Sequence, residues 1–216
     1  MNGATGYRLG KRAVTQDRTR QRITGAAERL YLERWYDDVS LREVAGEAGV
    51  ALQTVVNHFG SKGGLLAAVA ESVGTGVDRR RDEVAAGDVA GGVAMIVDEY
   101  ERIGDGIVRM IALEGRVEEL APLLAGGRAV HRGWVERVFA AWLTAESAAE
   151  RERRTVMLIA ATDVLTWKIL RREQGLSRDD AEAAMRESVV ALTDRFDAGA
   201  RPRGREAREA SEAAAG

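Results

Sequence analysis

Apolar residues recur three or four positions apart along most of the chain, which is the spacing of one face of an α-helix. The pattern is clear at Ile23, Ala26, Ala27 and Leu30. No segment alternates apolar and polar residues with a period of two for long, and strand formers are outnumbered by Ala, Glu, Arg and Leu. The sequence therefore predicts an all-α protein.

Local signals predict where these helices begin and end. Ser-x-x-acid boxes at Ser40/Glu43, Ser147/Glu150 and Ser177/Asp180 mark starts, because the Ser oxygen accepts an early backbone N–H. Glycines tolerate positive φ and predict stops or hinges at Gly49, Gly60, Gly87, Gly104 and Gly175. The predicted helices cover residues 17–34, 41–47, 51–58, 62–86, 89–103, 105–114, 122–144, 148–174 and 178–198.

The composition of the 216 residues, 45% apolar and 31% charged with two prolines, is that of a soluble globular chain of one or two domains. The absence of cysteine excludes disulfides and cysteine-based zinc sites. The longest strongly apolar run, Val156 to Ala161, is far shorter than the ~20 residues that span a bilayer. Arg8, Lys11 and Arg12 precede no apolar stretch of the secretory type. We expect a cytoplasmic protein without a membrane partner.

Charge is distributed unevenly along the chain. The net charge is −2, but residues 1–22 carry six cations against one anion, a net of +5. Residues 1–62 together carry +3, and the remainder carries −5. A basic N-terminal segment before an acidic body indicates a nucleic-acid partner for the N-terminal part. A solvated tail is the alternative interpretation.

The segment from Ser40 to Phe59 contains two short amphipathic helices separated by Gly49. We expect the first to bury Leu41, Val44, Ala45 and Ala48, and Val50 and Val55 to bury the second against it. Small residues that let two helices approach, with a glycine at the turn, are typical of a helix-turn-helix motif. The outer face, which suits a major groove, then carries Leu52, Gln53, Thr54, Asn57 and His58.

Residues 22–66 resemble the N-terminal domain of the tetracycline-repressor-like (TetR) family of transcriptional regulators. The resemblance is carried by stretches in register, among them Ala48-Gly49-Val50 and Asn57-His58-Phe59-Gly60-Ser61-Lys62. It implies three DNA-binding helices, a long connecting helix, and a helical bundle that binds a ligand and dimerises through its last two long helices. Four regions follow: a basic flexible arm (1–16), a helix-turn-helix DNA-binding domain (17–62), a ligand-binding and dimerisation bundle (63–199) and a disordered tail (200–216).

The chain departs from the family pattern at three positions. Trp35 stands where a glycine usually ends the first helix, so we expect that helix to end without a left-handed residue. Val56 replaces a tyrosine and removes a phenolic donor. Ala51 offers no side-chain cap to the following helix.

Side-chain chemistry assigns roles within the motif. Arg42 can pair bidentately with guanine and Gln53 with adenine, while Thr54 can touch a thymine methyl or a phosphate. We predict base contacts from Arg42, Leu52, Gln53 and Thr54, and phosphate contacts from Ser40, Asn57, His58 and Lys62. The alternatives are a solvated charge for Arg42, a surface amide for Asn57 and a packed capping histidine for His58.

The larger part of the chain carries aromatic and Met residues on helical patterns, and the family resemblance makes some of them candidates for an effector cavity. Core packing is the alternative for each. Asp163 interrupts an apolar run and must find a partner, a helix N-terminus or a ligand, because an unpaired buried carboxylate is costly. The predicted pocket residues are Tyr100, Met110, Trp134, Val138, Asp163 and Trp167.

The resulting hypothesis is a ligand-responsive transcriptional repressor. We expect a homodimer that binds a palindromic double-stranded DNA operator and is released by a small-molecule effector. An activator on the same scaffold, or a helical interaction protein without specific DNA binding, is the alternative. Only two histidines occur, and phosphate-binding glycine loops and nucleophile elbows are missing, so we predict no enzyme, catalytic residue, metal or cofactor.

Overall fold

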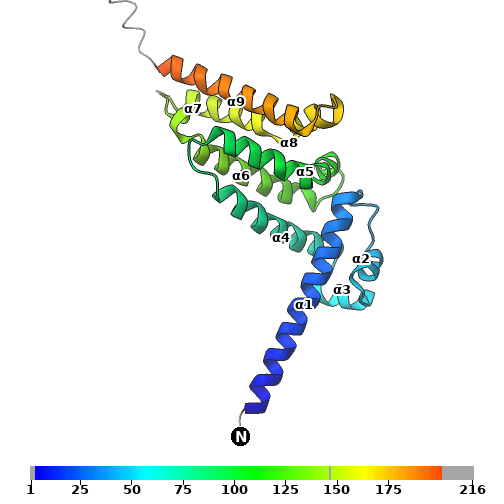
Figure 1. Cartoon of the computed structure of the whole chain (residues 1–216). Helices are drawn as coiled ribbons and strands as arrows, with labels where there is room; N and C mark the ends of the chain where they lie inside the picture. The colour runs from blue at the N-terminus through cyan, green and yellow to red at the C-terminus, as the bar shows by residue number, and fades with distance from the viewer. Residues whose placement is uncertain (1–2, 146, 201–216) are drawn as a thin grey trace, which may run out of the picture. The chain divides into compact units, whose positions relative to one another are not determined.

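The computed structural model describes the backbone of residues 3–145 and 147–200, and the side chains of residues 14–145 and 147–198. Every regular element within these ranges is a helix, which confirms the all-α fold class (Figure 1). The elements are α1 (Gly3–Glu33), α2 (Leu41–Ala48), α3 (Leu52–Phe59), α4 (Lys62–Asp82), α5 (Val89–Leu113), α6 (Leu120–Val138), η1 (Ala140–Leu143), α7 (Ala148–Thr162), α8 (Val164–Lys168), η2 (Ile169–Glu173) and α9 (Arg178–Ala200). In the described part of the chain, no helix has the length and apolar character that crossing a membrane requires.

The chain divides into two compact units. The first comprises Met1–Arg80 and Glu99–Ala129, and the second comprises Arg81–Asp98 and Val130–Gly216. The helix-turn-helix lies in the first unit. The predicted tail, apart from Ala200 at the end of α9, lies outside the described residues.

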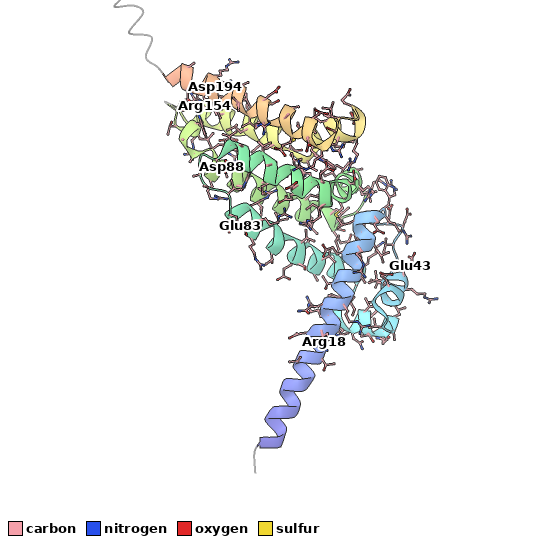
Figure 2. All side chains as sticks on the ribbon, in the orientation of Figure 1. Arg18, Glu43, Glu83, Asp88, Arg154 and Asp194 are labelled. Carbon is pink, nitrogen blue, oxygen red and sulfur yellow. The ribbon has the colours of Figure 1, made fainter. Side chains whose placement is uncertain are left out.

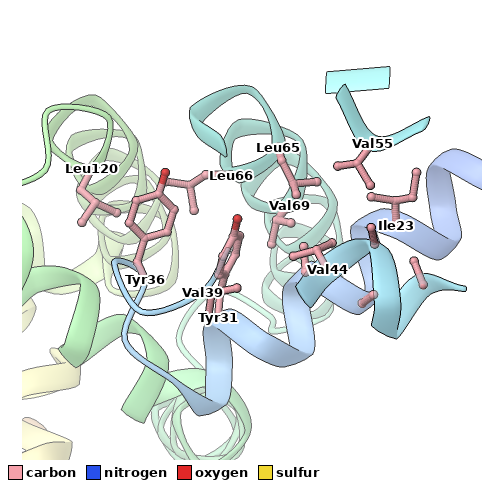
Figure 3. Packing of buried hydrophobic residues seen from close by; sticks show 14 of the residues in the cluster. Ile23, Tyr31, Tyr36, Val39, Val44, Val55, Leu65, Leu66, Val69 and Leu120 are labelled. Carbon is pink, nitrogen blue, oxygen red and sulfur yellow. The ribbon is translucent and has the colours of Figure 1, made fainter. Parts of the chain in front are cut away.

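Apolar side chains from six helices form the core of the first unit (Figure 3). The predicted helix-turn-helix residues Val44, Ala45, Ala48 and Val55 are all at most 5% exposed. The cluster also takes Leu120 from α6, which is fully buried. The helices that follow the motif therefore contribute to the core on which it rests.

Two predicted boundaries in the first unit are wrong. α1 begins at Gly3 instead of residue 17 and runs through the segment predicted as a flexible arm, because no proline stops the helix there. The predicted break at Gly104 is absent, and α5 continues through it. The nearby Gly106 serves close packing: a Cβ there would lie 2.6 Å from Leu32 Cδ2. Arg109 of the same helix donates a hydrogen bond to the Leu32 carbonyl.

The helices between residues 120 and 174 also differ from prediction. α6 starts at Leu120 and ends at Val138, before a short 3-10 helix. The predicted continuous helix 148–174 is interrupted, because Asp163 takes an extended conformation (φ −74°, ψ 151°) and accepts a hydrogen bond from the Leu165 N–H at 2.8 Å. The carboxylate thereby caps α8. Of the three uses considered for Asp163, the structure shows the helix N-terminus.

Polar contacts join the helices of the second unit. Arg154 is buried and donates to the carbonyls of Trp142 and Thr144 at 3.1 and 3.0 Å. Arg178, at the start of α9, pairs with Asp98 of α5 at 2.6 Å. The predicted caps at Ser147 and Ser177 are present, with backbone hydrogen bonds of 3.1 Å each.

Candidate nucleic-acid interface

The helix-turn-helix begins at the capping box of α2. Ser40 Oγ accepts from the Glu43 N–H at 3.2 Å, and the Ser40 N–H donates to the Glu43 carboxylate at 2.8 Å. Arg34 donates to the same carboxylate at 2.8 Å. The Arg34 hydrogen bond, assisted by those from Ser40, lowers the pKa of Glu43 to about 2. These contacts, which centre on Glu43 (Figure 2), fix the angle at which the chain enters α2.

The turn between α2 and α3 is held by backbone geometry and by one cation from α1. Gly49 has φ 63°, the left-handed conformation predicted for it, and Val50 N–H bonds to the Ala45 carbonyl at 2.9 Å. Arg22 donates to the carbonyls of Ala48 and Gly49, the second at 3.2 Å. A guanidinium at the carboxyl end of α2 satisfies free carbonyls and complements the helix dipole.

The outer face of α3 carries two exposed amides. Val55 is fully buried, whereas Gln53 and Asn57 are exposed and Leu52 is 37% exposed. Gln53 Nε2 donates to Asn57 Oδ1 at 2.9 Å. Thr54 and His58 are half-buried beside this face. Ala51 gives α3 no side-chain cap, as predicted.

The remaining predicted DNA contacts have different surroundings. Arg42 is exposed on the first turn of α2, and the Ser40 hydroxyl is engaged in the capping box. Lys62 is half-buried, with Nζ 4.3 Å from the Tyr36 ring centroid and a 3.4 Å hydrogen bond to the Asp37 carbonyl. Burial lowers the pKa of Lys62, although nearby carboxylates oppose this. A phosphate contact by Lys62 therefore competes with intramolecular partners.

The cations of α1 also divide by environment. Arg18 is exposed (Figure 2), while the Arg20 guanidinium lies 4.8 Å from the centroid of the Phe59 ring on α3. Arg22 holds the turn, a role that the sequence reasoning missed. The sequence shows how many cations this segment carries. It does not show that the fold brings Arg22 into contact with Ala48, 26 positions further along the chain.

The six predicted ligand residues do not all belong to one unit. Tyr100, which is buried, and Met110, which is half-buried, lie in the first unit on α5. Trp134 and Val138 of α6, the α8 cap Asp163, and Trp167 lie in the second unit. Trp167 is fully buried and has the Arg172 guanidinium 4.6 Å from its ring centroid.

A buried polar cluster around Trp134 was not predicted. His131 stacks on Trp134 with ring centroids 5.6 Å apart, lies 3.5 Å from Arg81 and 3.1 Å from the Thr162 hydroxyl. Burial, and then the Arg81 charge, lowers the pKa of His131 to about 3. The Trp134 indole N–H is buried without a hydrogen-bond partner. Within the described residues no group of three or more His, Cys, Asp or Glu is arranged to hold a metal ion.

Comparison with known proteins identifies the motif. Residues 23–69 match the model of the family described as bacterial regulatory proteins, tetR family. A TetR-family transcriptional regulator from Streptomyces coelicolor superposes with a TM-score of 0.67 at 18% identity, covering 93% of this chain and 99% of the other. A transcriptional regulator from Rhodococcus sp. Rha1 gives 0.66 at 20% identity, covering 81% and 96%.

A third solved structure, SmeT in complex with triclosan, gives a TM-score of 0.59 at 19% identity and covers 80% of this chain and 90% of its own. No curated protein sequence matches this chain. The chain thus has the fold of solved TetR-family transcriptional regulators, and its residues 23–69 match the tetR-family model.

Proposed function

We propose that this protein is a TetR-family transcriptional repressor that binds a palindromic operator as a homodimer and is released by a small-molecule effector. The observation that carries the proposal is the orientation of α3. Its buried Val55 fixes the helix against the core, while Gln53 and Asn57 stay exposed on the opposite face. Amide side chains on an exposed recognition helix supply the donors and acceptors that base edges require.

The proposed dimer uses the C-terminal helices of the second unit. Four large apolar side chains are 40–50% exposed there: Val156 on α7, Leu165 on α8, Ile169 on η2 and Val190 on α9. A second copy of the chain would remove this apolar surface from water. A dimer with two-fold symmetry presents two recognition helices, which need a spacing of about 34–36 Å to read successive major grooves. Ile169→Glu should therefore yield a monomer in sedimentation experiments.

The effector is proposed as a small molecule bound within the second unit, beside the predicted pocket residues Trp134, Val138 and Trp167. Two solved structures with this fold support ligand binding: SmeT in complex with triclosan, and the multidrug binding protein EbrR in complex with imidazole. An effector that prefers the DNA-incompetent state shifts the population, and a coupling of about 1–3 kcal/mol changes operator affinity roughly 5- to 150-fold.

Selection of duplexes from a random pool with the purified full-length protein tests the function. We expect a palindromic consensus, nanomolar affinity in fluorescence polarisation and a steep dependence on salt. Lys62→Ala should weaken binding to every duplex and reduce the log–log salt slope by about 0.9, as loss of one phosphate contact does. An unenriched pool and salt-insensitive binding would favour an interaction protein instead.

The position of the selected site decides between repressor and activator. A site that overlaps the promoter, with transcription reduced by the protein in a purified system, supports repression. Increased transcription from the same template supports the activator, which uses the same DNA-binding surface.

A further inference from the structure

The exposed polar chemistry of α3 is concentrated in one pair of amides, Gln53 and Asn57. We propose that Asn57 is a positioning residue that holds the Gln53 amide in the orientation that selects adenine. This inference rests on the proposed DNA-binding function. It assigns Asn57 a part in sequence specificity, whereas the sequence alone predicted a phosphate contact.

The geometry that supports the pair is simple. Residues four apart on a helix lie on one face within reach of each other, and Gln53 Nε2 donates to Asn57 Oδ1 at 2.9 Å. The contact lies on the exposed side of α3, opposite the fully buried Val55. The amide of Gln53 is thus partnered before any duplex arrives.

The hydrogen bond has a direct consequence for base recognition. A primary amide has one carbonyl oxygen and two N–H groups. When one N–H is given to Asn57, Gln53 retains its oxygen as an acceptor and its second N–H as a donor. Adenine presents the matching groups in the major groove, the N6 donor and the N7 acceptor. The pair therefore leaves free the two groups that an adenine edge needs.

Without Asn57 the order of these groups is not fixed. The terminal torsion of Gln is broad and roughly two-fold, so the amide can rotate and exchange the places of its oxygen and nitrogen. The exchanged amide places an acceptor opposite adenine N7, which is also an acceptor. Asn57 Oδ1 accepts only from the nitrogen, so while the Asn57 oxygen faces Gln53, as it does in the structure, one orientation of the Gln53 amide is favoured over the other.

The test measures base preference in addition to affinity. The probes are the duplex selected by the wild-type protein and the three duplexes that differ at the base pair whose preference Gln53→Ala abolishes. Asn57→Ala should reduce the preference for adenine there by about two- to tenfold, the effect of losing one neutral hydrogen bond. Preferences at other base pairs should be unchanged. Both side chains are exposed, and thermal unfolding checks that each variant is folded.

Asn57→Asp is the matched control, because it keeps the acceptor while adding a negative charge. It should retain the adenine preference and weaken binding to all four duplexes alike through repulsion from phosphates. In the double variant, Gln53→Ala with Asn57→Ala, preference should equal that of Gln53→Ala alone, since a positioning residue has no effect without the group it positions.

Three outcomes would overturn the inference. Uniform weakening of all four duplexes by Asn57→Ala, with preference kept, identifies a phosphate contact. Loss of the adenine preference in Asn57→Asp shows that an acceptor oxygen at position 57 does not hold Gln53 in the adenine-selecting orientation. Additive losses in the double variant show that the two amides act independently. A wild-type protein that selects no sequence overturns the proposed function, and this inference with it.

Discussion

The helix-turn-helix and the second unit bury different kinds of side chains. In the helix-turn-helix, Ile23, Val44 and Val55 are fully buried apolar residues, and the capping box lies at the start of α2. In the second unit, the buried residues include Arg81, His131, Arg154, Thr155, Thr162 and Thr193. The first region is therefore held by an apolar core with polar caps, and the second has polar groups inside its packing.

This difference bears on how far each region follows from local sequence. An apolar core needs only the right spacing along each helix, which the periodicity displays. Buried polar groups need partners, and these come from distant segments. Arg81 and His131 are 50 positions apart, and His131 and Thr162 are 31 apart. No local sequence pattern predicts a contact between residues so far apart in the chain.

The largest effect is expected in the apolar core of the first unit. Leu120→Ala removes a fully buried side chain that α6 contributes to the cluster around the helix-turn-helix. Loss of burial and the remaining cavity should lower the free energy of unfolding by about 2–5 kcal/mol. Denaturant unfolding of the full-length protein measures this. Leu123→Ala, on the same helix but only partly buried, should cost clearly less; equal losses would contradict the assignment of Leu120 to this core.

Within the helix-turn-helix, the sequence predicted most of what the structure shows. Both short helices, the capping box at Ser40, the positive φ of Gly49 and the uncapped Ala51 were readable, because each depends on residues within a few positions. Arg22 and Lys62 were less readable. Their positions at the turn and over Tyr36 depend on how α1 and α4 fold against the motif.

In the rest of the chain, existence of helices was predicted better than their limits. The sequence predicts that a helix ends at Gly104, but α5 continues through this residue. Two residues later, Gly106 has a different use, because its missing side chain permits the close approach of Leu32. Asp163 was recognised as a costly residue within an apolar run, yet its use as a cap breaks the helix that was expected to contain it. A glycine can end a helix or allow close packing within it, and an acidic residue can lie within a helix or cap the start of the next one. Which of these occurs depends on the neighbouring elements, which the local sequence does not specify.

The buried polar cluster of the second unit should make stability depend on pH. The pKa of His131 is lowered to about 3, below its ordinary 6.5, so between these values the unfolded chain binds a proton that the folded chain does not. Stability therefore falls as pH drops below 6.5, by at most about 1.4 kcal/mol per pH unit. His131→Gln should remove this slope in unfolding measurements between pH 6.5 and 5.0.

The other histidine supplies the control for that measurement. His58→Gln changes a half-buried residue of α3 and should leave the slope in place. A slope that persists in His131→Gln, or vanishes in His58→Gln, would show that the buried cluster is not its source.

Replacing either of two helical glycines by alanine should change the free energy of unfolding by a smaller amount. The two changes should have opposite signs. Gly106→Ala places a Cβ 2.6 Å from Leu32 Cδ2 and 3.2 Å from Leu32 Cα, so overpacking should cost about 1–3 kcal/mol. Gly126→Ala meets nothing within 4 Å in α6 and should stabilise by about 0.5–1 kcal/mol through helix propensity. Thermal unfolding of both variants measures the difference; stabilisation by Gly106→Ala would show that α5 does not need the close approach.

The smallest effect separates the charge of α1 from its hydrogen bonds. Arg22→Ala and Arg18→Ala each remove one cation from the basic segment, but only Arg22 donates to the carbonyls of Ala48 and Gly49. Because Arg22 is largely exposed and screened by solvent, its loss should lower the free energy of unfolding by only about 1 kcal/mol. Arg18→Ala should change it by less than about 0.5 kcal/mol, as an exposed charge does. Equal urea midpoints for the two variants would mean that Gly49 and the backbone hold the turn unaided.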